Sequence, residues 1–187
     1  VVGVRFPKMR QDEIGARQES EEVAATYRRV AEEFTALLKR ELGEQLTSVV
    51  LYGSVARGQA RKESDIDLLI VVAGSREDRR ALEDRICNLS LDFEDGPLMS
   101  ELYRSGWRGI IQYVLFSEEE ALLTRPFYLD IAEDGQILFD REGFFQGKLA
   151  RLRQRMQELG TRRIYLGKDR WMWKLKADMV PGEKVEL

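Results

Sequence analysis

Two carboxylates, Asp65 and Asp67, stand at the start of a short apolar run, residues 66–72, whose other side chains are Val, Ile or Leu. A run this apolar and too short for a buried helix predicts a β-strand that is buried on both faces. Because side chains alternate along a strand, the two carboxylates point to the same side, about 6–7 Å apart. Two carboxylates this close repel each other and lose hydration beside a core, so the pair is unfavourable unless a cation lies between them. A site with oxygen ligands and no histidine favours Mg²⁺ or Mn²⁺ over Zn²⁺.

A glycine-serine turn precedes this strand. Residues 49–52 are apolar and β-prone, Gly53 and Ser54 follow them, and the next residues are able to begin a helix. Glycine lets the backbone approach a ligand closely, while serine either caps the helix or offers its hydroxyl. The free N–H groups at the start of such a helix attract phosphate, and Arg57 would add positive charge. The pattern therefore predicts a strand, a turn and a helix beside a phosphate.

Ten residues separate Ser54 from Asp65, and one residue separates Asp65 from Asp67. The stretch resembles the nucleotidyltransferase superfamily related to DNA polymerase β, in particular its minimal nucleotidyltransferases, whose motif reads roughly GS-x-ARG-x-A-x₃-SD-I-D-L. The matching residues are Gly53, Ser54, Ala56, Arg57, Gly58, Ala60, Ser64, Asp65, Ile66, Asp67 and Leu68. A P-loop is excluded, because Gln59 and Ala60 stand where lysine and serine or threonine would be needed.

The resemblance implies both a fold and an activity. The fold is α/β (α+β by some conventions), a small mixed β-sheet of three to five strands with helices packed mainly on one face. The activity is Mg²⁺-dependent transfer of a nucleoside monophosphate, most often AMP from ATP, to a hydroxyl on a protein, an RNA or a small molecule. By the same resemblance Asp65 and Asp67 are catalytic and bind the metal, while Gly53, Ser54 and Arg57 bind the nucleotide.

One expected residue is absent from the motif. In this superfamily a third carboxylate usually comes from the strand that follows the aspartate pair, yet the predicted strand over residues 109–116 contains no acid. Gln112 stands at the best matching position, and Asp92, Glu94 or Asp130 are the alternatives. Without this third carboxylate, a second function remains open. The protein would then be a catalytically weakened nucleotide-binding or antitoxin module that pairs with a HEPN-type helical partner.

The length of 187 residues, 43% of them hydrophobic, suits one globular domain with appended elements. We expect a loose N-terminal arm over residues 1–18 and a nucleotidyltransferase domain over residues 19–145, whose first helix is capped near Ser20. Residues 146–187 are expected to form a helix that ends at Gly160 and then a basic, aromatic tail. Further helices are expected over the segments 76–91, 97–105 and 126–133, and a strand over 137–139.

The C-terminal segment permits two interpretations. Its basic residues are interleaved with aromatic ones, a pattern that suits a nucleotide base, an RNA strand or an acidic partner. The simpler interpretation, which we favour, is a solvated helix face followed by a hairpin that packs its own aromatic side chains. The residues concerned are Lys148, Arg151, Arg153, Arg155, Arg162, Arg163, Lys168, Arg170, Tyr165, Trp171 and Trp173.

Charge and composition exclude some classes of protein. A net charge of −3 and a pI near 5.3 give no general attraction to nucleic acid, so such contacts would be local. The single cysteine, Cys87, forms no internal disulfide and is expected to be buried, which suits a reducing cytoplasm. With no apolar run of membrane-spanning length and no signal-peptide pattern, we expect a cytoplasmic protein without membrane contact.

Overall fold

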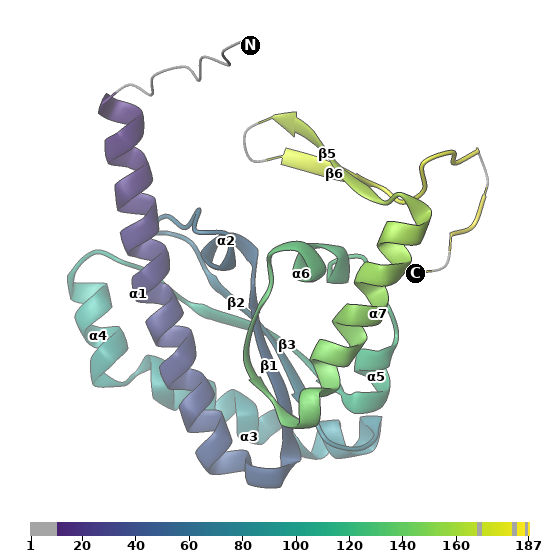
Figure 1. The fold of residues 1–187 in the computed structure, drawn as a ribbon. Coiled ribbons are helices and arrows are strands. Elements are labelled where there is room, and N and C mark those ends of the chain that lie inside the picture. The colour runs from purple at the N-terminus through teal and green to yellow at the C-terminus, as the bar shows by residue number, and fades with distance from the viewer. Residues whose placement is uncertain (1–10, 168–169, 181–182, 186) are drawn as a thin grey trace.

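The computed structural model describes residues 11–167, 170–180, 183–185 and 187. Its centre is a four-stranded mixed sheet in the order β3-β2-β1-β4 (Figure 1). The strands are β1 (Leu46–Tyr52), β2 (Ile66–Val72), β3 (Ile111–Ser117) and β4 (Gln136–Asp140). β1 runs antiparallel to β2 and β4, whereas β2 and β3 are parallel. The predicted α/β class and the mixed sheet are confirmed.

Helices cover both faces of this sheet. One face packs against α1 (Gln11–Leu42), α3 (Arg76–Glu94) and α4 (Pro97–Arg104), and the other against α5 (Glu118–Leu122), α6 (Tyr128–Asp134) and α7 (Phe144–Leu159). The alternation along β2 explains this, because Leu68 and Ile70 enter one core while Leu69 and Val71 enter the other. The expectation of helices mainly on one face was therefore wrong, since a strand apolar on both faces needs cover on both.

Helix α1 begins at Gln11, well before the predicted start near Ser20. The early turns have no apolar periodicity, but Gln, Glu, Ala and Arg are good helix formers, so an established helix extends through them. Residues 11–18 are therefore helical rather than a loose arm, and residues 1–10 of the predicted arm lie outside the described residues. The buried side chains of α1 include Tyr27 and Phe34, at helical spacing.

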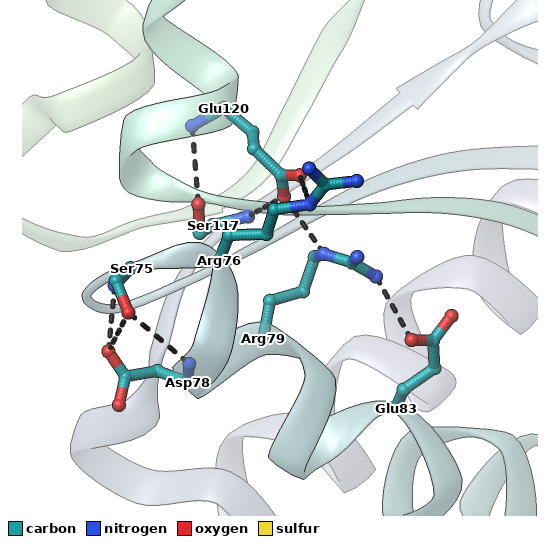
Figure 2. Close-up of polar contacts among 7 residues, drawn as sticks. All are labelled: Ser75, Arg76, Asp78, Arg79, Glu83, Ser117 and Glu120. Carbon is teal, nitrogen blue, oxygen red and sulfur yellow. Dashed lines mark hydrogen bonds and ion pairs between the residues drawn. The ribbon is translucent and has the colours of Figure 1, made fainter.

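Paired caps fix the start of α3 and of α5 at one end of the sheet (Figure 2). Ser75 and Asp78 form the capping box of α3, and Ser117 with Glu120 forms that of α5. The carboxylate of Glu120 also meets Nε of Arg79 at 2.9 Å, which ties the two helix starts together. The predicted helix start at Ser117 is confirmed, and this acidic turn is structural.

A two-stranded hairpin follows α7. Gly160 ends α7 in the left-handed conformation, as predicted, and β5 (Arg162–Gly167) then pairs with β6 (Arg170–Lys174). Shorter elements complete the fold: α2 (Gly53–Ala56) and the 3₁₀ turns η1 (Gly43–Gln45) and η2 (Arg141–Gly143). The predicted terminal hairpin is confirmed.

Cys87 is exposed, contrary to the prediction of a buried residue. It follows the buried Ile86 on α3, and one step along a helix turns the side chain by about 100°, away from the core. Among the described residues, no helix combines the length and the apolar character that a membrane span requires.

Candidate active site

Gly53 lies directly against the carboxylate of Asp67. Its φ is +75°, and a Cβ atom at this position would lie 2.1 Å from Oδ2 of Asp67. The register explains the contact, because Tyr52, the last residue of β1, pairs with Asp67 on β2. Only glycine tolerates both this backbone conformation and this approach. Strand pairing thus brings the predicted turn onto the predicted acid pair.

The environment of Asp67 is unfavourable to its charge. Burial, and then the nearby carboxylate of Asp65, raise the pKa of Asp67 to about 6, while Arg57 acts in the opposite direction. The same cluster reaches Tyr52, whose pKa rises to about 12 through burial and the charge of Asp67. A divalent cation between the two carboxylates would remove the repulsion that they now exert on each other.

Gln112 occupies the position opposite Asp67 on the parallel strand β3. Its Nε2 donates a hydrogen bond of 3.0 Å to Oδ2 of Asp65. The side chain thus reaches the acid pair as a neutral amide, where the family resemblance led us to expect a third acid. Gln112 adds a hydrogen-bond donor to Asp65 and no negative charge.

Two of the other candidates for the third acid, Glu94 and Asp130, serve different contacts. Glu94 accepts a hydrogen bond from the backbone N–H of Ile111. Asp130 accepts from Arg163, Trp171 and Trp173. Within the described part of the chain, no group of three or more His, Cys, Asp or Glu side chains gathers closely enough to hold a metal ion.

The residues present nevertheless fit a hard divalent cation. Mg²⁺ is commonly held by one or two carboxylates together with water and substrate phosphates, and does not need a cage made entirely of protein ligands. Asp65 and Asp67 supply two carboxylates, and the raised pKa of Asp67 indicates the charge that such an ion would balance. Substrate and water oxygens would have to complete the shell.

A pocket of about 250 Å³ opens beside the Gly53 turn, and neither Asp65 nor Asp67 is among its lining residues. Its lining residues are Ser54, Arg57, Gln59, Arg61, Ser64 and Trp171. Ser54 and Arg57 belong to the predicted nucleotide-binding set, so the structure brings both to one hollow. In the described part of the chain, Arg57 forms no ion pair; its Nε donates to Gln59 Oε1 at 3.2 Å. Its positive charge therefore remains available to a phosphate.

Helix α1 holds the loop between the turn and the carboxylates. The hydroxyl of Ser20 donates to the carbonyl oxygens of Gly58 and Ala60. The hydroxyl of Tyr27 donates to the carbonyl of Lys62 at 2.5 Å and accepts from the N–H of Gly109 at 3.0 Å. These contacts fix the loop on both sides of Ala60, so α1 helps to set the position of Asp65, which directly precedes β2.

Trp171 is the site residue whose position the sequence did not reveal. Its ring lies against Arg57, with 4.8 Å from the guanidinium carbon to the ring centroid, and its Nε1 donates to Asp130 Oδ1 at 2.9 Å. The sequence marked the aromatic and basic composition of this segment but not its location. A contact between residues so far apart in the chain leaves no periodic signal in the sequence.

The family model that matches this chain and the name of a curated relative point to the same family. The model of the nucleotidyltransferase domain family matches residues 29–124. A relative from Methanocaldococcus jannaschii, "Putative protein adenylyltransferase MJ1305", is 26% identical over 153 residues, which cover 81% of this chain and 95% of the relative.

Two solved structures are similar to this chain at low sequence identity. A "putative nucleotidyltransferase" from Sulfolobus solfataricus is 23% identical, with 75% of this chain and 95% of that chain covered and a TM-score of 0.39. The complex of a tri-AMPylated Shewanella oneidensis HEPN toxin with the MNT antitoxin gives 15% identity, 70% and 87% coverage and a TM-score of 0.40. Since the family match spans just over half of the chain and includes the turn and both carboxylates, the protein belongs to the nucleotidyltransferase domain family.

Proposed function

We propose that the protein transfers a nucleoside monophosphate, AMP from ATP, to a hydroxyl group of an acceptor, with Mg²⁺ or Mn²⁺ held by Asp65 and Asp67. The observation that supports the proposal is the contact of the Gly53 turn with Asp67, because a glycine-serine turn of the kind that can approach phosphate then lies against one of the two carboxylates. The name of the Methanocaldococcus jannaschii relative supports AMP as the transferred group and a protein as the acceptor.

The reaction exchanges one bond to phosphorus for another. The acceptor oxygen forms a bond to the α-phosphorus of ATP, the bond from this phosphorus to the oxygen that bridges to the β-phosphate breaks, and pyrophosphate leaves. The hydroxyl proton passes to water. When bound, the metal would supply Lewis-acid charge that neutralises the phosphates and lowers the pKa of the attacking hydroxyl.

The side chains of this protein mainly position the substrate. The backbone at Gly53 and the hydroxyl of Ser54 would hold the β- and γ-phosphates, and the guanidinium of Arg57 would meet their charge in the pocket. Catalysis of this kind depends on positioning and on charge placed where it develops, so few groups need to exchange protons.

Labelled ATP tests the proposal. With Mg²⁺ or Mn²⁺ and a cell lysate, ATP labelled at the α-phosphate should label an acceptor, whereas ATP labelled at the γ-phosphate should not. The double variant Asp65→Asn with Asp67→Asn should abolish labelling. Transfer of the γ-label instead would contradict nucleotidyl transfer.

Thermal protection locates the nucleotide. Ligands that bind only the folded state raise stability by mass action, so ATP should raise the melting temperature only when a divalent ion is present. Ser54→Ala should weaken this protection. Equal protection without metal would place the nucleotide away from Asp65 and Asp67.

The amide at Gln112 favours a second candidate, a nucleotide-binding module with weak or no transfer activity. Such a module would act by pairing with a protein partner, and a HEPN-type helical protein is the partner that the family resemblance suggests. Intact binding of Mg²⁺ and ATP without labelling of any acceptor would support this candidate against the enzyme.

A further inference from the structure

The hairpin β5–β6 lies at the same end of the sheet as the nucleotide turn. Figure 1 shows it above α6 and near α2, although it follows α7 in the chain. Trp171 of β6 lines the pocket together with Ser54 and Arg57. A segment remote in sequence therefore forms part of the wall of the candidate site.

Two cations already lie over the ring of Trp171. The guanidinium carbon of Arg57 is 4.8 Å from the ring centroid, and that of Arg163 is 4.6 Å away. Arg163 is neutralised by Asp130 at 3.1 Å and by Asp134 at 2.7 Å. Arg57 has no ion pair in the described part of the chain, so it is the cation on this ring that keeps its charge for a ligand.

A hydrogen bond to Asp130 on α6 fixes the orientation of Trp171. Its Nε1 donates to Oδ1 of Asp130 at 2.9 Å, and the same oxygen accepts from Trp173 and Arg163. Asp130 lies on α6, which packs into the core through Tyr128 and Leu129. The indole is thus held by a rigid element and presents its face to Arg57.

We propose that Trp171 is a positioning residue for Arg57: the indole face holds the guanidinium at the pocket, where it meets the triphosphate of the nucleotide. This inference rests on the proposed function. Arg57 and Trp171 line the same pocket as Ser54, so the indole holds the guanidinium on the wall where the proposed phosphate site lies. A ring that carries two guanidinium groups serves to hold these cations rather than to stack on a nucleotide base.

The first measurement is binding of ATP with an α,β-methylene bridge, in the presence of Mg²⁺, so that no transfer occurs. Because exposed cation–π contacts are modest, Trp171→Ala should weaken binding by about 3–10-fold, and Trp171→Phe, which keeps an aromatic face, should weaken it less. Met172→Ala is the matched control, since Met172 is the exposed neighbour on the opposite face of the hairpin and should leave binding unchanged.

A double-mutant cycle separates positioning from a general structural role. If Trp171 acts through Arg57, the double variant Arg57→Ala with Trp171→Ala should bind the analogue as weakly as Arg57→Ala alone. A full additional loss in the Arg57→Ala background would overturn the proposal. Thermal unfolding of each variant without nucleotide shows whether the hairpin remains folded, and Trp171→Phe provides the test if Trp171→Ala does not fold.

Fluorescence gives a signature that does not require nucleotide. In a protein with Trp107→Phe and Trp173→Phe, the emission of Trp171 should shift when Arg57 is replaced by Ala and should not shift with Met172→Ala. Emission unchanged by Arg57→Ala would overturn the contact itself.

The two proposals fail in different ways. If the wild-type protein does not bind the analogue with Mg²⁺, the proposed function is wrong and the inference falls with it. If the wild type binds and Trp171→Ala binds equally well, the role of Trp171 is refuted while the proposed function stands.

Discussion

The side-chain amide of Gln112 donates a 3.0 Å hydrogen bond to the carboxylate of Asp65, and Gln112 is also the register partner of Asp67. A neutral side chain from the neighbouring strand therefore contacts Asp65 and starts from the position opposite Asp67. An acid in its place would supply a third carboxylate from the strand on which the family resemblance predicts one.

Replacing Gln112 by Asp should strengthen metal binding and increase transfer. Loss of a ligand or of a group that orients it commonly costs about 10–100-fold in affinity or activity, so we expect a gain toward the lower end of this range. Calorimetric titration with Mn²⁺ and the rate of α-label transfer measure the two effects. Gln112→Asn, which stays neutral, should produce neither gain. Unchanged Mn²⁺ affinity in the Asp variant would exclude this position as the missing ligand.

Replacing Gly53 by Ala should disrupt the site more than the same change at Gly58. Both residues have positive φ, so each substitution should cost about 1–2 kcal/mol of stability from backbone strain. A Cβ on Gly53 also collides with Asp67, whereas a Cβ on Gly58 meets nothing within 4 Å. Urea unfolding and Mn²⁺ titration should show extra destabilisation and lost metal binding only for Gly53→Ala. Equal effects would mean that Asp67 moves aside freely.

Asp67→Asn should stabilise the metal-free protein above pH 6. The pKa of this carboxyl is 3.8 when unperturbed and about 6 in the folded protein, mainly because of burial. Below about pH 4 the carboxyl is protonated in both the folded and the unfolded protein, so it costs no stability. As the pH rises, the unfolded protein loses this proton first, and the loss of folding stability is complete above pH 6. Since water partly screens this partly exposed group, we expect a gain of about 1–2 kcal/mol in the free energy of unfolding.

Urea unfolding at pH 4 and pH 8 tests this expectation. The Asn variant should gain stability relative to wild type at pH 8 and little at pH 4. Asp92→Asn, at an exposed position on α3, is the control and should be neutral at both values. A stability difference that is the same at both pH values would show that the ionised carboxylate carries no folding penalty.

Tyr27→Phe should destabilise the protein and loosen the loop before Asp65. The hydroxyl satisfies both the carbonyl of Lys62 and the N–H of Gly109, and leaving buried groups unpaired costs about 1–3 kcal/mol. Hydrogen exchange at Gly109 should accelerate. Tyr103→Phe, at an exposed tyrosine, should change neither quantity. An unaltered exchange rate at Gly109 would argue that the hydroxyl does not hold the loop.

Local patterns predicted much of this structure. The apolar run at residues 66–72, the turn at Gly53 and the cap at Ser117 lie where the sequence placed them, because each depends on neighbouring residues. The early part of α1 escaped prediction because helix extension needs no apolar periodicity.

Contacts between remote segments were beyond the reach of these patterns. Nothing in the spacing of residues connects Trp171 with Arg57. Nor does it show that Asp130 accepts a hydrogen bond from the hairpin residue Trp171, where it was a candidate metal ligand. Gln112, the position that the sequence offered for the missing acid, pairs with Asp67 on the parallel strand β3, and its equivalence to a metal ligand stays a prediction.

The place of the hairpin in the chain also bears on synthesis. β1 and β2 pair across a short loop, and contacts between residues near in sequence form early in folding. The Gly53 turn and Asp67 should therefore come together early. The hairpin joins them only across a long separation, after β3, β4 and α7. A chain still emerging from the ribosome would thus possess its acid pair before it possesses the indole proposed to hold Arg57, and full affinity for nucleotide would arrive only with the hairpin.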